Sequence, residues 1–364
     1  MKQSYILTSI LFLSLVYPTK AQTLTLVSDK VTSDVTGLEF DGDALYFISH
    51  YINIYKLNST LQTPITEEHV YTHPTISISF DDQVLYGGKL YIAIAANDTI
   101  YKLDPTAATP TLETVIGTGT DTSPANLALD GDVLYIANYA ADKITKVNLA
   151  AATPSIEDVL TTDLDRPNNL AIYNDELYIG EENNQRISKI NLTGTPNRET
   201  VLSNINVNSL AFYGADLYVA DGDTYEIFKI TVTDPDPPST KTNVVTGLIS
   251  SYLFSMAFKG STLYFEGRVD SATGYRIYRT DVGTLGSNTA QQPRLVLYPN
   301  PASQRIHLTN LTQTTAYRIH NILGATVKEA TISNNEQIDI SGLGKGLYFI
   351  KLKDNPTALK FVKE

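Results

Sequence analysis

The chain has 364 residues, of which 42% are hydrophobic and 18% are charged, a balance typical of folded proteins and unlike that of disordered ones. Its formal net charge of −12 argues against a nucleic-acid partner, because phosphate backbones are bound by clustered Lys and Arg. It contains no cysteine, which excludes disulfides, thiolate metal sites and a lipidated cysteine, while its 23 tyrosines and many β-branched residues favour strands.

Residues 1–21 have the organisation of a secretory signal peptide. Lys2 precedes an apolar stretch from Tyr5 to Tyr17, which gives way to Pro18 and to small residues ending at Ala21. This stretch is shorter than the roughly 20 residues that a membrane-spanning helix needs. We therefore predict cleavage after Ala21, export of the chain, and no transmembrane segment in the mature protein.

The middle of the chain is a repeat in which a Leu-Tyr pair follows a tight polar turn. Successive leucines are 40 to 46 residues apart, and each unit contains four short strand-like segments. Four strands in each of six units predict an all-β fold, a six-bladed β-propeller, in preference to an extended solenoid. The pairs are Leu45-Tyr46, Leu90-Tyr91, Leu134-Tyr135, Leu177-Tyr178, Leu217-Tyr218 and Leu263-Tyr264.

The sixth unit has no clear fourth strand after Arg279. Residues 24–30, which precede the first unit, are similar in pattern to the fourth-strand segments at 157–161 and 199–203. We predict that this N-terminal segment completes the last blade, which would join the two ends of the ring and remove an open sheet edge.

The composition changes again after residue 282. Residues 283–293 are rich in Gly, Ser, Asn, Thr, Gln and Pro, which predicts a linker. Residues 22–293 carry 16 basic and 34 acidic side chains, whereas residues 294–364 carry 9 and 5. Alternating apolar and polar residues in this last part predict a small C-terminal β-sandwich. The expected organisation is a signal peptide at 1–21, a propeller at 22–282, a linker at 283–293 and a C-terminal domain at 294–364.

Two resemblances accompany these patterns. The run P-A-N-L-A-L-D-G-D-V-L-Y-I-A at 124–137 resembles the NHL-repeat and gluconolactonase-like six-bladed propellers. The blocks L-Y-P-N-P-A-S, Y-R-I-H-N-I-L-G and I-D-I-S-G-L-G-K-G-L-Y-F-I-K-L resemble the type A C-terminal sorting domain of the type IX secretion system, with Pro299, Asn300 and Pro301 as its sorting motif. The second resemblance implies a Bacteroidetes source, recognition by the secretion machinery, and passage through the periplasm to the medium or the outer cell surface.

The propeller resemblance implies architecture more than activity, since such folds serve as hydrolases and as binding platforms. The metal-binding Glu of gluconolactonase-like proteins is expected where this chain has Val35-Thr36-Gly37-Leu38, and Glu39 is displaced into the strand. This departure favours a module that binds a glycan, peptide or protein. The alternative is a metal-dependent hydrolase or lactonase, and no catalytic residue is predicted.

The ligand site is predicted at the rim of the central channel. Eight residues before each repeated leucine an innermost strand begins, and four residues after it the second strand ends, so both positions fall on one face. Polar residues there give the candidates Asp82, Asn126, Asn138, Asn169, Glu181, Ser209 and Asp221. Oxygen ligands also suit Ca²⁺ or another divalent cation, with Asn126, Asn169, Glu181 and Asp221 as candidate ligands. The competing interpretation is that such residues merely favour the turns where strands begin.

Overall fold

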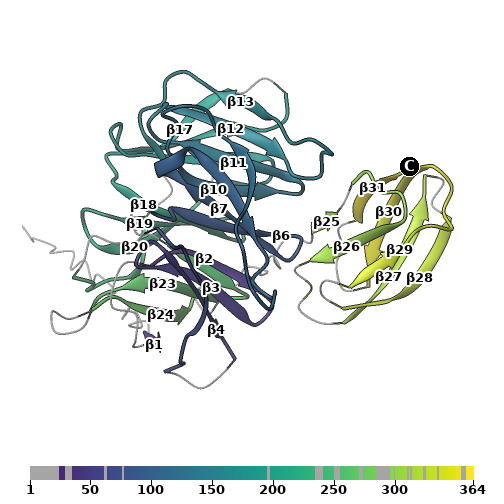
Figure 1. Ribbon diagram of the computed structural model, residues 1–364, viewed down its shortest axis with the longest axis horizontal. Helices are drawn as coiled ribbons and strands as arrows, with labels where there is room; N and C mark the ends of the chain where they lie inside the picture. Colours follow the sequence, from purple (N-terminus) through teal and green to yellow (C-terminus); the bar gives the residue numbers. More distant parts are fainter. Residues whose placement is uncertain are drawn as a thin grey trace, which may run out of the picture.

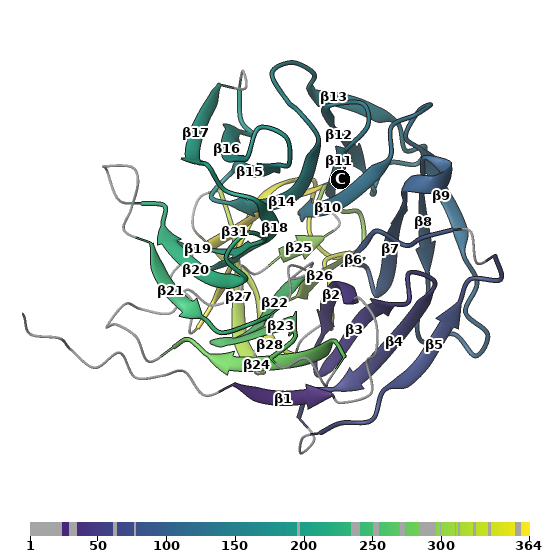
Figure 2. The same cartoon turned by 90° about the vertical axis from the view of Figure 1, so that its left-hand side faces the viewer.

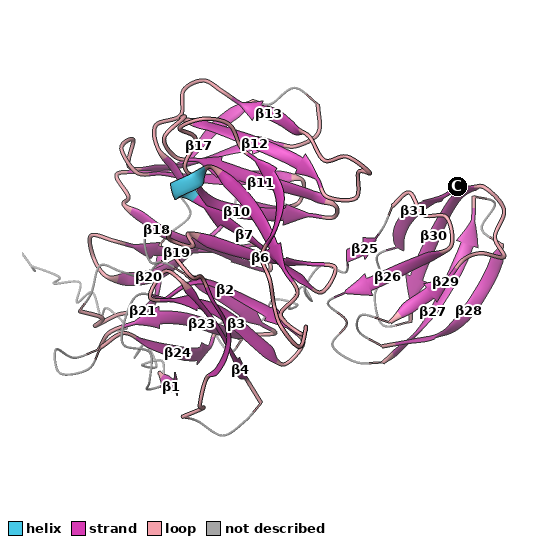
Figure 3. Ribbon diagram, viewed as in Figure 1, coloured by secondary structure: helices cyan, strands magenta, loops and turns pink. Residues whose placement is uncertain are grey.

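Six four-stranded antiparallel sheets surround a central axis, as the computed structural model shows (Figures 1 and 2). Strands dominate, and the described residues include one short 3-10 helix, η1 at Ala95–Asn97 (Figure 3). The structure describes residues 24–28, 35–60, 64–75, 78–194, 197–233, 241–249, 255–269, 274–283, 296–298, 300–309, 311, 314–322, 325–333, 336–353 and 358–364. The predicted cleavage site at Ala21 lies outside them. In the described part of the chain, no helix has the length and apolar character needed to cross a membrane.

Each of these six sheets is one blade of a propeller, and in blades 1 to 5 the strands follow one another in chain order. Blade 1 is β2(Val35–Asp41), β3(Ala44–Ser49), β4(Asn53–Asn58) and β5(Glu68–Thr72). Blade 2 is β6(Asp82–Tyr86), β7(Lys89–Ile94), β8(Thr99–Leu103) and β9(Glu113–Gly117), and blade 3 is β10(Pro124–Asp130), β11(Val133–Asn138), β12(Lys143–Asn148) and β13(Ile156–Leu160). Blade 4 is β14(Pro167–Tyr173), β15(Glu176–Glu181), β16(Arg186–Asn191) and β17(Arg198–Ser203), and blade 5 is β18(Val207–Tyr213), β19(Asp216–Asp221), β20(Glu226–Thr231) and β21(Thr242–Val245).

Blade 6 combines both ends of the propeller sequence. It contains β22(Met256–Lys259), β23(Thr262–Gly267) and β24(Arg276–Asp281), and its outer strand is β1(Thr25–Ser28). Strand β1 pairs antiparallel with β24, with Thr25 opposite Arg279. The prediction that the N-terminal segment completes the last blade is confirmed. The innermost strand β22 also contacts β2, so the ring is closed.

The Leu-Tyr repeat is explained by the way blades pack. Adjacent residues on a strand point to opposite faces, so the leucine and tyrosine of one pair enter two different junctions between blades. Each repeated tyrosine shares a buried cluster with the leucine of the following blade: Tyr46 with Leu90, Tyr91 with Leu134, Tyr135 with Leu177, Tyr178 with Leu217, Tyr218 with Leu263, and Tyr264 with Leu45. The repeat therefore supplies one tyrosine and one leucine to every junction.

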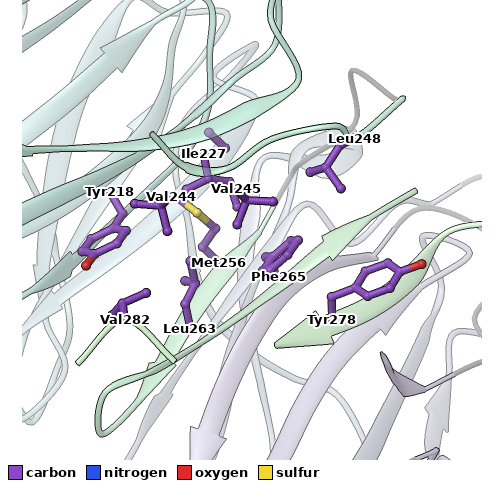
Figure 4. Packing of buried hydrophobic residues seen from close by; sticks show 11 residues of the cluster. Tyr218, Ile227, Val244, Val245, Leu248, Met256, Leu263, Phe265, Tyr278 and Val282 are labelled. Atoms are coloured by element: carbon purple, nitrogen blue, oxygen red, sulfur yellow. The ribbon is translucent and has the colours of Figure 1, made fainter. Parts of the chain in front are cut away.

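The junction of blades 5 and 6 shows this packing from close by (Figure 4). Tyr218 and Ile227 of blade 5 lie in one cluster with Met256, Leu263 and Phe265 of blade 6, and all five are buried. Burial of apolar surface stabilises such a junction by about 25 cal/mol per Å² removed from water.

The C-terminal part consists of two further antiparallel sheets. One contains β25(Val296–Tyr298), β26(Arg305–Thr309) and β29(Gln337–Asp339), and the other contains β28(Thr326–Ile332), β27(Thr315–Asn321), β30(Gly346–Leu352) and β31(Ala358–Lys363). Buried residues of both sheets, including Ile306, Ile338, Ile319 and Ile350, form a single hydrophobic cluster. This part shares no buried cluster with the propeller among the described residues.

Candidate ligand site at the channel rim

The innermost strands begin at one end of the ring, which we call the channel rim. Among the described residues, hydrogen bonds join the start of one innermost strand to the start of the next at five junctions, so these strands run in the same direction. The bonds are Gln83 Nε2 to Gly37 O (2.7 Å), Leu127 N to Asp82 Oδ2 (2.9 Å), Leu170 N to Asn126 Oδ1 (2.8 Å), Asn169 Nδ2 to Val207 O (3.1 Å) and Leu38 N to Ser255 Oγ (2.8 Å).

Two of the predicted rim residues link three blades. Asp82 of blade 2 accepts hydrogen bonds from Asn126 Nδ2 at 2.8 Å and from the backbone N–H of Leu127. Asn126 of blade 3 in turn accepts the backbone N–H of Leu170 in blade 4. These bonds satisfy backbone N–H groups at the start of the next blade, which is a structural role. Asp82 and Asn126 both keep part of their surface accessible.

Three other predicted residues are buried away from the rim surface. Asn138 is fully buried and donates from Nδ2 to Thr145 Oγ1 at 2.9 Å, within its own blade. Asn169 and Ser209 are each 5% exposed. Their burial suits the packing of blades rather than contact with a ligand in the channel.

The two predicted carboxylates have partners of their own. Glu181 is fully buried at the end of β15 and receives hydrogen bonds from Arg186 Nε (2.8 Å), Arg198 Nη2 and Asn184 Nδ2 (2.9 Å). Burial alone would raise the pKa of Glu181, but the donors, led by Arg186, outweigh it and hold this pKa below its usual value. Asp221 accepts the backbone N–H of Asp223 at 2.9 Å, which closes its own turn.

In blades 4 and 5 the predicted residues Asn169 and Ser209 are each one position away from the accessible residue, because of β-bulges. The pairing register shifts at the start of β10, β14 and β18, between Pro124 and Asn126, between Pro167 and Asn169, and between Val207 and Ser209. The bulged residues are Ala125, Asn168 and Asn208, and each is part-exposed. A bulge re-aims a side chain and is often found beside functional sites.

Asn168 and Asn208 come from consecutive blades at the same rim. Asn168 Oδ1 accepts from Asn169 Nδ2 at 3.1 Å. The side chains of Asn206 and Asn208 pack over Gly222, where a Cβ atom would lie 2.8 Å from Asn208 Oδ1 and 2.9 Å from Asn206 Nδ2. Glycine at 222 therefore leaves room for these two amides.

A carboxylate occupies an unusual place at the junction of blades 1 and 2. Glu39 lies opposite Tyr46, where the other blades have Val84, Ala128, Ala171, Ala211 and Ala257 opposite their tyrosines. Burial raises the pKa of Glu39 to about 8. Repulsion from Asp82 also raises this pKa, whereas a hydrogen bond from the backbone of Leu85 lowers it. Burial likewise raises the pKa of Asp82 to about 7. Both groups therefore hold a proton at mildly acid pH.

Among the described residues, no three His, Cys, Asp or Glu side chains are grouped as metal ligands. The predicted set of Asn126, Asn169, Glu181 and Asp221 is distributed over blades 3, 4 and 5, and each of these side chains has protein partners.

Asn168 and Asn208 were missed because a regular strand was assumed. Proline at the start of an innermost strand, as at Pro124 and Pro167, is the sequence signal of such a bulge.

Asn300 of the sorting motif is hydrogen-bonded to the last strand, β31. Asn300 Oδ1 accepts the backbone N–H of Val362 at 2.8 Å, and Asn300 Nδ2 donates to Lys360 O at 3.1 Å. Ala302 and Lys363 form a parallel β-bridge beside them. Asn300 thus holds the beginning of this part beside β31 by hydrogen bonds. Pro299 lies outside the described residues.

Comparison with known families identifies the C-terminal part. Residues 296–364 match the family described as "Secretion system C-terminal sorting domain". They are the sorting domain of the type IX secretion system, and the protein is exported to the cell surface or secreted. A comparison with curated proteins found no match.

Solved structures show the fold of the remainder. A luciferin-regenerating enzyme has a TM-score of 0.59 and 13% identity, covering 74% of this chain and 98% of that one. A calcium-binding protein, regucalcin, from Agrobacterium tumefaciens has a TM-score of 0.55 and 13% identity, covering 72% and 95%. A proposed gluconolactonase has a TM-score of 0.53 and 14% identity, covering 72% and 93%. At such identities the likeness establishes the propeller fold alone.

Proposed function

We propose that this exported propeller is a binding module whose channel rim takes a glycan, peptide or protein ligand outside the cell. The observation that carries the proposal is the pair of bulges that bring Asn168 and Asn208, from consecutive blades, to part-exposed positions at the rim. Amide groups donate and accept hydrogen bonds at once, which suits recognition of a polar ligand.

The test is binding of the full-length secreted protein to two printed arrays, one of oligosaccharides and one of peptides. Replacing Asn168 and Asn208 together by Leu is expected to abolish the wild-type signal, because a leucine offers no hydrogen bond. Lys89→Ala, at the opposite end of the ring, is the matched control and should bind normally. Equal binding by wild type and the double variant, or no binding on either array, would refute the proposal.

A metal-dependent hydrolase is the second candidate. Asn168 and Asn208 also offer the amide oxygens that hard cations accept, and a regucalcin described as calcium-binding shares the fold. Ca²⁺, Mg²⁺ or Zn²⁺ at millimolar concentration would then raise the melting temperature, because an ion that binds only the native state stabilises that state. Such a rise, lost in the Asn168/Asn208 variant and accompanied by lactone hydrolysis, would favour this candidate over the binding module.

We also propose the domain limits of the sequence analysis, with a propeller at 22–282, a linker at 283–293 and a C-terminal β-sandwich at 294–364. The separate hydrophobic clusters of the two parts support independent folding. A chain ending at Gln292 is therefore expected to fold and to accumulate in the periplasm, measured by fractionation against the full-length protein. Secretion of this truncated chain at full-length levels would contradict both the limits and the role of the C-terminal domain.

A further inference from the structure

Three side chains meet at the channel rim where blade 3 joins blade 4. The guanidinium carbon of Arg166 lies 5.4 Å from the centre of the Tyr139 ring. The Tyr139 hydroxyl donates to Glu182 Oε2 at 2.6 Å, and Arg166 Nη1 lies 4.0 Å from Glu182 Oε1. Tyr139 directly follows β11, Arg166 directly precedes β14 and Glu182 directly follows β15, so all three belong to the rim.

The segment that carries Arg166 is held in an unusual conformation. Arg166 has a φ of 52°, in the left-handed region, and Ser123, which precedes β10 at the corresponding position of blade 3, has a φ of 46°. Its backbone N–H donates to Asp142 Oδ1 at 2.7 Å, and its carbonyl accepts the N–H of Glu182 at 3.1 Å. Two residues earlier, buried Leu164 anchors the segment in the junction. These bonds hold Arg166 in place beside Glu182.

The polar ends of the group are open to solvent. The Arg166 side chain is 48% exposed and that of Glu182 is 42% exposed. Blade architecture does not require the group, because the junction of blades 2 and 3 has Ala95, Ser123 and Tyr139 at the corresponding positions, and the junction of blades 4 and 5 has Glu182, Asn206 and Gly222. The set of guanidinium, phenol and carboxylate is therefore particular to this junction.

We propose that Tyr139, Arg166 and Glu182 bind a neutral saccharide, an inference that rests on the proposed binding function and names its ligand class. Adjacent sugar hydroxyls both donate and accept, and they are matched by a guanidinium, which only donates, beside a carboxylate, which only accepts. The part-exposed ring of Tyr139 supplies an apolar surface for the C–H face of the sugar. The charges of Arg166 and Glu182 offset each other, so the group has no net positive charge that would favour uronic or sialic acids.

The experiment measures binding of the full-length secreted protein to neutral oligosaccharides built from glucose, galactose or mannose, and to uronic-acid and sialic-acid oligosaccharides. Arg166→Gln and Glu182→Gln are each expected to weaken binding of the neutral sugars roughly 10- to 100-fold, the effect of losing hydrogen bonds to a charged group. Arg268→Gln, an arginine that directly follows β23 at the same rim, is the matched control and should bind normally. Melting temperatures should change little, because the replaced side chains are partly exposed.

Several outcomes separate this inference from the proposed function. Preferential binding of acidic sugars, or neutral-sugar binding unaffected by both variants, would overturn it. Binding of peptides but no saccharide, lost in the Asn168/Asn208 variant, would overturn the saccharide inference while upholding the binding module. Absence of binding on both arrays would defeat the two together.

Discussion

Glu39→Gln is expected to leave stability nearly unchanged near pH 5 and to raise the melting temperature at pH 8, where the gain in the free energy of unfolding is at most about 4 kcal/mol. The pKa of Glu39 is raised from 4.5 to about 8, so between these values the folded protein keeps a proton that the unfolded chain releases. Stability contributed by this group is complete below pH 4.5 and falls as pH rises towards 8. Glutamine is neutral throughout and still accepts the backbone N–H of Leu85.

The measurement is thermal unfolding of wild type and variant at several pH values from 5 to 8. Asp82 titrates in the same window, with a pKa of about 7, so the variant should keep part of the pH dependence. Glu157→Gln, which removes an exposed carboxylate and the same unit of charge, serves as the control. Its melting temperature should depend on pH as that of wild type does. If the melting temperature of Glu39→Gln depends on pH as steeply as that of wild type, Glu39 is not a buried ionisable group at this junction.

Glu181→Gln is expected to destabilise the propeller by about 2–3 kcal/mol at pH 7, because it leaves Arg186 and Arg198 without their shared counter-ion. Those arginine side chains keep 27% and 15% of their surface exposed, which moderates the loss. The same group makes the wild type less stable in acid, since the lowered pKa of Glu181 contributes stability above pH 4.5 that is lost as pH falls below it.

Chemical denaturation at pH 7 measures this effect, with Glu182→Gln as the matched control. Glu182 is the next residue, carries the same charge and is partly exposed, so its replacement should change stability by less than about 0.5 kcal/mol. A combined Glu181→Gln and Arg198→Met variant should recover part of the loss. If Glu181→Gln proves as stable as wild type, the ion cluster does not stabilise the fold, and the predicted ligand-binding role of Glu181 is favoured instead.

The blades could be predicted because the same Leu-Tyr pair recurs in every repeat, with its two side chains on opposite faces of the sheet. Leucine and tyrosine stand at fixed positions since each must fill a different junction, and the turn residues between them mark the strand ends. The N-terminal closing strand was also predictable, because the sixth unit had one strand too few. These features depend on periodicity, which a sequence displays directly.

The site depended on details that periodicity hides. A bulge at the start of β14 adds one residue, so counting from Leu177 led to buried Asn169 in place of part-exposed Asn168. Glu181 stood at the predicted strand end, but the two arginines that neutralise it come from two further strands. One of them was detectable, since Arg186 lies directly opposite Glu181 across the β15–β16 hairpin. Arg198 was not, because its reach is set by tertiary packing.

The closing strand has a consequence for the order in which this protein can acquire its shape. Strand β1 pairs with β24 across some 250 residues of chain, a contact of very high sequence separation. Proteins dominated by such contacts fold slowly, because chain entropy is lost before the contact forms. Until β24 is present, β1 has no partner strand, and its hydrogen-bonding edge is open to other chains. The ring can therefore close only when both ends of the propeller sequence are available to each other, and a chain cut before β24 would lack the partner of its first strand.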